Sequence, residues 1–468
     1  MKKTPLSLST LAVFALLAAG AFSAVQAQPP LERSSIKKPQ AVAPQPTIRT
    51  SREATLIRAG STNKVACVVV PAKELFITDV SVVDDCFRTT WAGVCPPPVA
   101  PATRGAWTFG KLVEGIFGTN NPAILSTEVT RTLNEWKFAK VVNGELVPAR
   151  PAVTGAIINP WLTASGGVQL DMKKAPFRLL AIVARLDLRQ NAPWTAGEGR
   201  FVFGLLDAAG NQTQYLLIME YGLDAAGCTD VLKWANAWHN LGTLPFGPNY
   251  NAALQGVTDA FTSIGASPAK PNGSAINQVR TDEIFLAAPW ELREFTLQPA
   301  STGPPSQLLM SPVAQTPENA HQNTALLANY ENANAAAILA NAYSVPLLWA
   351  TVPFKGGASS HNLNFNWDGP PPACTSIPPA VRQEFSLNTC NGCHGAETGT
   401  VFKHVQPRNA GVPSVLSNFL TGAGPVVVDM CGIGHTFSDI ARRQADLCNL
   451  VTSSCTTLSA EPPVRFVH

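Results

Sequence analysis

Charged side chains are scarce in this 468-residue chain. Asp, Glu, Lys and Arg make up 14% of it, against roughly 25% in an average soluble domain. The 34 basic and 31 acidic residues nearly cancel, and no block of Lys and Arg forms the basic footprint of a nucleic-acid-binding protein. Hydrophobic residues make up 46%, which excludes a disordered chain. Composition therefore predicts a globular protein and no nucleic-acid partner.

Several functional signatures are also missing. The sequence has no internal repeat and no Gly-rich phosphate loop after a strand. The spacing of Ser, His and Asp assembles no catalytic triad. These absences leave the catalytic residues unknown and name no substrate.

The N-terminal segment has the pattern of an export signal. Lys2 and Lys3 precede an apolar run, residues 6–25, that ends at the small-residue site before Gln28. We expect residues 1–27 to be a signal peptide, and residues 28–50, rich in Pro, to be an extended tether. No later run is long enough to span a bilayer. The expected location is periplasmic or secreted, with no membrane anchor after cleavage.

Ten cysteines follow in what is then an oxidising compartment. If Cys390 and Cys393 are set aside, eight remain, enough for four disulfide bonds in any of 105 connectivities. Short loops favour two local pairs, Cys86–Cys95 and Cys448–Cys455. The remaining connections stay open.

Residues 51–354 have the pattern of an α+β domain of unknown function. Apolar runs rich in β-formers predict a meander of strands, over 177–188, 200–207 and 214–223. Asn143 and Gly144 predict a hairpin, because a type I′ turn needs positive φ at both central residues. Helical spacing predicts three later helices, over 230–241, 250–263 and 324–343. Strands followed by helices favour the α+β class, with a mixed or antiparallel sheet.

Some residues in this region resemble catalytic groups but have simpler explanations. Trp234 and Trp238 stand at i and i+4 and are expected to share a buried face, with His239 held by a hydrogen bond. Two Glu–Arg pairs are expected to be ion pairs, namely Glu198 with Arg200 and Glu291 with Arg293.

A Pro- and Gly-rich segment, residues 355–379, marks the best domain boundary. Immediately after it, Cys390, Cys393 and His394 form C-x-x-C-H, the pattern of covalent c-type haem attachment. Two thiols one helical turn apart can add to the vinyl groups of one porphyrin, and the adjacent imidazole can then bind iron. A redox disulfide, a zinc half-site or a structural bridge would use the same cysteines. No second C-x-x-C completes a zinc set nearby.

Residues 380–468 resemble a small mono-haem cytochrome c domain, mainly α-helical. VRQEFSLNT provides the helix before the motif, Pro407 follows it, and a final helix has Thr436 as its expected cap with Asp439 at the third position. In that family a backbone carbonyl near such a proline orients the proximal histidine. The resemblance implies one covalent haem c per chain, bound by Cys390, Cys393 and His394.

The sixth ligand is open, because the usual distal Met lies further from the motif than any Met here. His404 comes ten residues after His394, and Met430 comes 36 residues after it. His435 is a third candidate, and the position can also be vacant. The expected metal ligands are therefore His394 with His404 or Met430.

The remaining sequence resembles exported bacterial proteins of unestablished function. The phrases that carry this resemblance are APFRLLAIVARLDLR, GEGRFVFGLLDAAGN, LAAPWELREF and LNTCNGCHGAETGT. Two hypotheses follow. The first is an exported mono-haem electron-transfer protein, with a redox partner protein or as the redox module of an oxidoreductase. The second is a disulfide-stapled extracellular binding or structural protein without haem.

Overall fold

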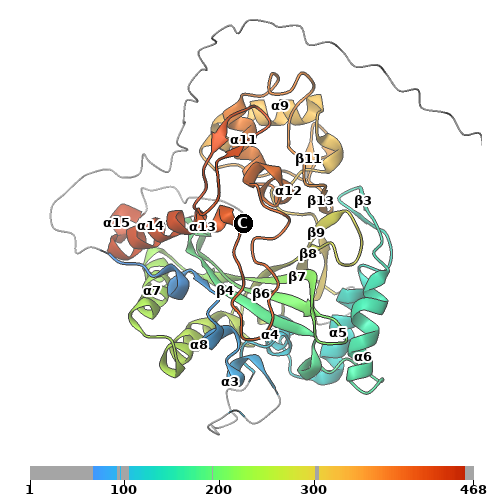
Figure 1. Ribbon diagram of the computed structural model, residues 1–468, viewed down its shortest axis with the longest axis vertical. Coiled ribbons are helices and arrows are strands. Elements are labelled where there is room, and N and C mark those ends of the chain that lie inside the picture. The colour runs from blue at the N-terminus through green and yellow to red at the C-terminus, as the bar shows by residue number, and fades with distance from the viewer. Residues whose placement is uncertain (1–66, 92–94, 96–104, 192, 301–304, 459–468) are drawn as a thin grey trace, which may run out of the picture. The chain divides into compact units, whose positions relative to one another are not determined.

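The computed structural model describes residues 67–91, 95, 105–191, 193–300 and 305–458. All of them belong to one compact unit, Ile48–His468. The expected signal peptide and tether lie outside the described residues. The fold is α+β, as predicted, with helices packed on an antiparallel sheet (Figure 1).

The sheet contains nine strands within the described residues, in the order β1-β4-β6-β7-β8-β9-β10, with β5 beside β6 and β13 beside β9. The strands are β1 Phe76–Ile77, β4 Phe177–Arg185, β5 Gln190–Asn191, β6 Trp194–Leu206, β7 Gln212–Asp224, β8 Ile276–Glu283, β9 Trp290–Gln298, β10 Gln307–Ser311 and β13 Ser359–His361. The three predicted central strands are confirmed as β4, β6 and β7. Neighbouring strands follow each other in the chain, so short turns are enough to connect most of them.

The described residues also form three separate two-stranded hairpins. They are β2 Lys140–Val142 with β3 Glu145–Val147, β11 Leu348–Trp349 with β12 Val352–Pro353, and β14 Val427–Val428 with β15 Gly434–His435. The predicted turn is confirmed, because Asn143 and Gly144 have φ values of 51° and 85°.

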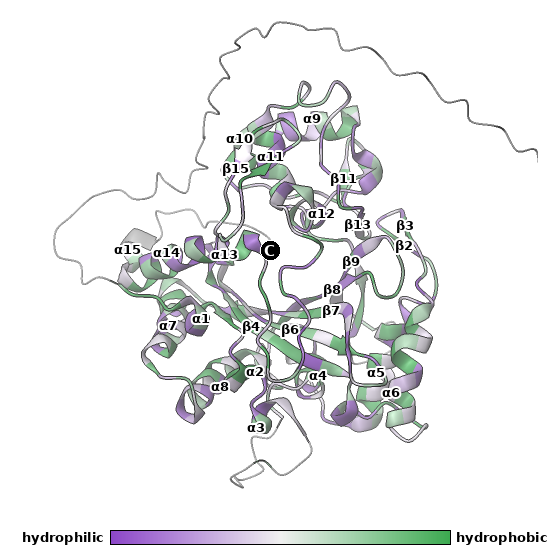
Figure 2. Ribbon diagram, viewed as in Figure 1, coloured by the Kyte–Doolittle hydropathy of each residue, from purple (hydrophilic) through white to green (hydrophobic). Residues whose placement is uncertain are grey.

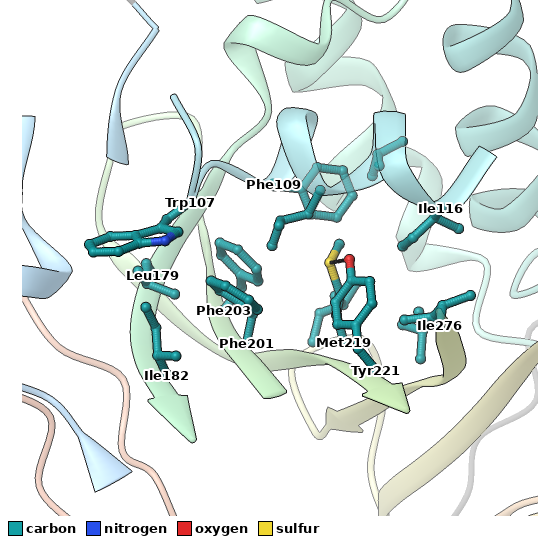
Figure 3. Close-up of a cluster of buried hydrophobic side chains, with 14 of the residues drawn as sticks. Trp107, Phe109, Ile116, Leu179, Ile182, Phe201, Phe203, Met219, Tyr221 and Ile276 are labelled. Carbon is teal, nitrogen blue, oxygen red and sulfur yellow. Dashed lines mark hydrogen bonds between the residues drawn. The ribbon is translucent and has the colours of Figure 1, made fainter. Parts of the chain in front are cut away.

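One face of the sheet packs against helices. Alternate residues of β6 and β7, including Phe201, Phe203 and Tyr221, join the largest apolar cluster (Figure 3). The long helices that contribute to it are α4 Phe109–Phe117, α5 Pro122–Asn134, α7 Cys228–Asn240, α8 Pro248–Thr262 and α14 Asp439–Thr452. Hydrophobic residues dominate β4, as its colour in Figure 2 shows. This face therefore contains the main core.

The opposite face of the sheet, called the second face here, packs against the C-terminal segment. Leu180 and Val183 of β4, with Val202 of β6, share an apolar cluster with Cys393 and Phe419. Because side chains alternate across a strand, the same strands can serve both clusters. The second face therefore supports the segment that carries the C-x-x-C-H motif.

Two of the three predicted helices are confirmed as α7 and α8. Trp238 is fully buried, and Trp234 is partly buried against the same core. The hydrogen bond expected at His239 is also present, because its Nδ1 lies 2.7 Å from Glu74 Oε2. The two tryptophans and this histidine therefore have structural contacts, as predicted.

The helix predicted over 324–343 is interrupted at Asn334, giving α9 Ala325–Ala333 and α10 Ala335–Leu339. The Asn334 side chain donates to the Tyr330 carbonyl, 2.8 Å away. Such local bonds compete with helix continuation, which is the physical reason for the break.

Four disulfide bonds connect the eight remaining cysteines, all within described residues. They are Cys67–Cys448, Cys86–Cys95, Cys228–Cys455 and Cys374–Cys431. The prediction of Cys86–Cys95 is confirmed and that of Cys448–Cys455 is wrong. Helix α14 lies against α7 and α1 (Pro71–Glu74). This packing brings Cys448 of α14 to Cys67, and it brings Cys455, which follows α14, to Cys228.

Contacts thus join residues 380–468 to residues 51–354, across the predicted linker 355–379. The division into separate domains stays a prediction.

The shorter helices are α2 Val80–Val83, α3 Cys86–Thr89, α6 Asn159–Ala164 and α15 Cys455–Leu458. Among the described residues, no helix is both long and apolar enough to cross a membrane.

Candidate functional site: the C-x-x-C-H motif and the second face of the sheet

The motif forms its own short helix, α12 Cys390–Cys393, after α11 Pro379–Leu387, which confirms the predicted preceding helix. The Thr389 hydroxyl caps α12 by accepting from Gly392 N at 3.1 Å. A Cβ atom at residue 392 would lie 2.0 Å from the Ser386 carbonyl oxygen, so only glycine fits this close approach. The Trp367 indole N–H donates to Thr389 Oγ1 and Asn391 Oδ1. These contacts fix the orientation of α12.

Both motif thiols are buried and neither is in a disulfide bond. Cys390 packs with Trp290 and Leu292 of β9, whereas Cys393 packs on the second face. Burial raises the pKa of Cys390 to about 11 and raises the pKa of Cys393 as well. The two side chains are therefore protonated thiols at neutral pH.

The His394 imidazole is held by a backbone carbonyl, as the cytochrome c resemblance implied. Its Nδ1–H donates to the Phe402 carbonyl oxygen at 2.5 Å, so the carbonyl belongs to Phe402 and not to the neighbourhood of Pro407. The ring stacks on Trp290 with centroids 5.2 Å apart. Burial and the neighbouring His404 lower the pKa of His394 well below its ordinary value. The ring is therefore neutral at pH 7, the form that binds metals.

His404 lies beside this group. Its ring centroid is 4.5 Å from that of His394, and its Nε2 lies 3.4 Å from Cys393 Sγ. Its Nδ1 lies 2.8 Å from the Ser417 hydroxyl, at the start of α13 Asn418–Thr421. Burial lowers the pKa of His404 to about 4. Both imidazoles are thus neutral and close together.

The remaining two candidate ligands lie elsewhere. Met430, between β14 and β15, is 37% exposed, and His435 Nε2 lies 3.0 Å from Asp429 Oδ2. Neither is among the described residues that line the cavity at His394. The structure therefore brings His394, His404 and Cys393 together, and it does not bring Met430 or His435 to them.

A cavity of about 70 Å³ lies where the motif segment packs on the second face. His394 and His404 line one side of it. The sheet side contains ion pairs, including Arg200–Glu220 and Arg280–Glu220, at 3.3 and 3.2 Å. Sites for small organic ligands usually have about 300 to 1,000 Å³, so a large cofactor requires the lining residues to move apart.

The predicted ion pairs are confirmed, although they are more buried than surface pairs. Arg200 Nη2 lies 2.6 Å from Glu198 Oε2, and Arg293 Nε lies 2.6 Å from Glu291 Oε1. Each of these side chains is at most 10% exposed. Removing one partner of such a buried pair strongly destabilises the fold, because the other charge is left buried without a counter-charge.

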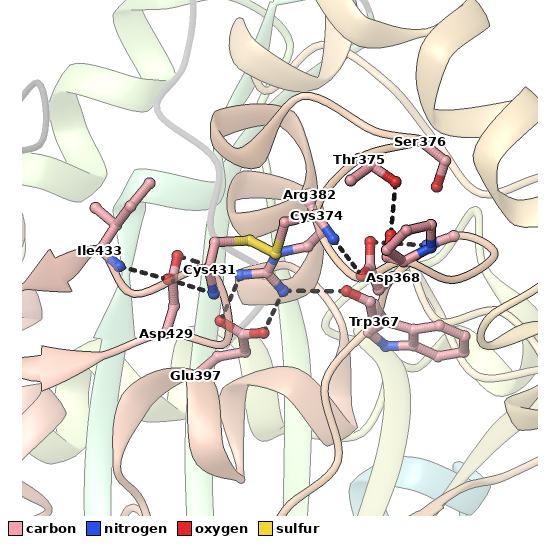
Figure 4. The surroundings of a disulfide bond; sticks show 12 residues. Trp367, Asp368, Cys374, Thr375, Ser376, Arg382, Glu397, Asp429, Cys431 and Ile433 are labelled. Carbon is pink, nitrogen blue, oxygen red and sulfur yellow. Dashed lines mark hydrogen bonds and ion pairs between the residues drawn. A yellow bond between two sulfur atoms is a disulfide. The ribbon is translucent and has the colours of Figure 1, made fainter.

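A second buried ion cluster fixes the chain on both sides of the motif (Figure 4). Arg382 of α11 pairs with Glu397, just after the motif, and with Asp429 beside the Cys374–Cys431 disulfide. Its Nη1 also donates to the Trp367 carbonyl. This cluster connects the helix before the motif with the turn after it.

The final helix, α14, differs in its first turn from the prediction. It begins at Asp439 after Ser438, and no side chain caps it, so the predicted cap at Thr436 is wrong. Asp439 is the first residue of the helix, and its carboxylate forms ion pairs with Arg442 and Arg443 one turn later. On this helix Leu447 is buried, while Ile440 is only partly buried.

Several residues at the site had no signal in the sequence. Asp282 of β8 has Oδ1 2.6 Å from Trp290 Nε1 and Oδ2 3.8 Å from His394 Nδ1. Burial raises the pKa of Asp282 to about 6 despite the nearby Lys403. His361 of β13 has its ring 4.6 Å from Trp290. Asp282 and His394 are 112 positions apart, and only the antiparallel sheet brings them together.

In the part of the chain that the structure describes, no group of three or more His, Cys, Asp or Glu side chains is arranged to hold a metal ion. The zinc interpretation therefore gains no support from a preformed ligand set. No family model, curated protein or solved structure matches this chain.

Proposed function

We propose that this chain is an exported mono-haem c-type electron-transfer protein. The observation that carries the proposal is the state of the motif: Cys390 and Cys393 are unpaired with each other while the other eight cysteines are bridged. An oxidising compartment favours bridging of free cysteines. Two unbridged thiols one helical turn apart, followed directly by a carbonyl-anchored His394, suit thioether attachment of a porphyrin with an imidazole ligand.

The donor chemistry of the site fits a haem. Cys390 and Cys393 would carry the two thioether bonds, and His394 would be the proximal ligand. Because His394 Nδ1 has the proton that it donates to the Phe402 carbonyl, Nε2 would be the nitrogen that coordinates iron. When bound, haem iron supplies a one-electron couple whose potential depends on the axial ligands and on burial.

His404 is the proposed sixth ligand, because it lines the same cavity as His394. The His394 and His404 ring centroids are 4.5 Å apart, so both imidazoles would be available to a haem iron held at this cavity. Met430, His435 and an open position are the competing assignments.

The C-terminal residues 380–468 are proposed to act as the haem-carrying part, resembling a cytochrome c domain. A redox partner protein would exchange electrons with it, or residues 51–354 would supply a substrate site and make the chain an oxidoreductase. The alternative function is a disulfide-stapled binding or structural protein without haem. The four disulfides are compatible with either.

Export is proposed on the signal pattern of residues 1–27. The expected mature protein begins at Gln28 and is periplasmic or secreted. Mass spectrometry of the intact protein from a bacterial host tests this directly. A chain that retains Met1 in the cell envelope fraction would contradict the proposal.

Covalent haem is tested in a host with a c-type maturation system. The full chain is denatured, extracted with acid, separated by electrophoresis and stained for haem. The proposal expects a stained band, lost or much weakened in Cys390→Ala and Cys393→Ala. A Cys86→Ser/Cys95→Ser double variant serves as the matched control and should keep the stain. An unstained wild-type band would favour the alternative without haem.

A further inference from the structure

Asp282 occupies an unusual position beside the motif. It lies near the end of β8 on the second face and is 1% exposed. Its Oδ1 accepts from the Trp290 indole N–H at 2.6 Å. Its Oδ2 lies 3.8 Å from His394 Nδ1 and has no hydrogen-bond partner among the described residues. A buried carboxylate oxygen without a donor is costly, so the position needs an explanation other than stability.

Trp290 and His394 form a single packed group with this carboxylate. The indole ring is nearly parallel to the imidazole, with an interplanar angle of 24°, and its N–H fixes the carboxylate at the imidazole edge. Three separate elements, β8, β9 and the end of α12, supply the three side chains. The sheet therefore sets the distance between the carboxylate and the ring.

One positive charge balances the carboxylate in part. Lys403 Nζ lies 3.6 Å from Asp282 Oδ1, and both side chains are at most 2% exposed. In such a buried site charges interact more strongly than in water. Removal of the Asp282 charge would leave Lys403 as the unbalanced charge near His394.

We propose that Asp282 is a positioning residue that lowers the reduction potential of the haem iron bound by His394. The inference rests on the proposed function. Reduction of ferric iron adds one electron, and a carboxylate beside the ligand disfavours that added negative charge. The Asp282 charge acts on the ring through space, because the Nδ1–H of His394 is donated to the Phe402 carbonyl and not to the carboxylate.

The test is a spectroelectrochemical titration of the haem-loaded full chain. Asp282→Asn keeps the shape and the Oδ1 acceptor for Trp290 but removes the charge. We expect the ferrous-to-ferric ratio at a fixed potential to rise about tenfold, equivalent to about 59 mV for a one-electron couple. Glu220→Gln is the matched control, since this buried carboxylate lines the same cavity but pairs with Arg200 and Arg280. Glu220→Gln should shift the reduction potential less than Asp282→Asn does.

The outcomes separate the inference from the proposed function. If the haem-loaded Asp282→Asn variant has the wild-type reduction potential, the role of Asp282 is overturned while haem binding stands. The same conclusion follows if Glu220→Gln shifts the potential as much as Asp282→Asn does. A wild-type chain without covalent haem overturns both. If Asp282→Asn does not accumulate, Asp282→Glu provides the second measurement. It keeps the charge, so its potential should equal or fall below the wild-type value, and a higher value would overturn the inference.

Discussion

His404 Nε2 lies 3.4 Å from Cys393 Sγ, and the other ring nitrogen, Nδ1, is 2.8 Å from the Ser417 hydroxyl. Ser417 thus anchors Nδ1, and Nε2 faces the motif. Metal-bound histidines usually have this arrangement, with one nitrogen anchored and the other directed at the metal. The relationship places a second suitable imidazole at the candidate haem site.

The first prediction concerns the sixth ligand. His404→Ala should change the ferric absorption spectrum of the haem-loaded chain, because an axial imidazole is lost. Met430→Ala should leave the spectrum unchanged, since Met430 is 37% exposed and does not line the cavity. Absorption spectra of both variants at equal haem content make the measurement. A change in Met430→Ala alone would exclude His404 as the ligand.

The second prediction concerns the connection between the C-terminal segment and α2. Arg408 donates to both carboxylate oxygens of Asp84, at 2.7 and 2.9 Å, and to the Leu179 carbonyl. Asp84→Asn leaves this guanidinium, which is 1% exposed, without its counter-charge. We expect the free energy of unfolding at pH 7 to fall by about 3 kcal/mol. Chemical denaturation of both proteins measures the difference.

The same pair has a defined pH dependence. Burial alone would raise the pKa of Asp84, but the bonds from Arg408 and Gly411 bring it below its ordinary value of 3.8. The stabilisation is therefore present above pH 3.8 and is lost as the pH falls through the lower folded-state pKa. The difference between wild type and Asp84→Asn should shrink over that acid range. A constant difference would contradict the assigned role of the charge.

Local features of the fold could be predicted from the sequence. Asn143 and Gly144 are adjacent and need positive φ, which defines the hairpin without reference to other residues. The strands β4, β6 and β7 follow from their apolar and β-branched composition. Cys86 and Cys95 lie close together along the chain. In each case the physical cause is local in the sequence.

The candidate site could be predicted only in part. The motif spacing identified Cys390, Cys393 and His394, because their chemistry depends on near neighbours. Asp282 and Trp290 had no such signal, since their contacts with His394 depend on how β8 and β9 pair. The exposure of Met430 was equally invisible, because it depends on the turn between β14 and β15.

The third prediction is the disulfide pattern. Digestion without reduction should yield linked peptides for Cys67–Cys448 and Cys228–Cys455, identified by mass spectrometry. These bridges join residues 381 and 227 positions apart, which constrains the unfolded chain strongly. Cys67→Ser/Cys448→Ser should lower the free energy of unfolding by about 2 to 5 kcal/mol. A Cys448–Cys455 peptide in folded protein would contradict the packing of α14.

The fourth prediction concerns Glu331 of α9, a buried acid in an apolar cluster. It is 0% exposed, and neither carboxylate oxygen has a hydrogen-bond partner among the described residues. Burial raises the pKa of Glu331 well above its ordinary value, and attraction to Arg382 offsets only part of this. The folded chain therefore holds this proton more tightly than the unfolded chain, so stability falls as the pH rises above 4.5.

Glu331→Gln keeps the volume but removes the titrating proton. The variant should be more stable than wild type at neutral pH, by roughly 1 to 3 kcal/mol. The gain should be small below pH 4.5, where the side chain is protonated in both states, and should grow as the pH rises. Denaturant unfolding at several pH values measures this gain. Glu331→Ala is the contrasting variant, because it also removes volume and leaves a cavity that is expected to destabilise the cluster. A pH-independent difference for Glu331→Gln would show that the charge of Glu331 does not limit stability.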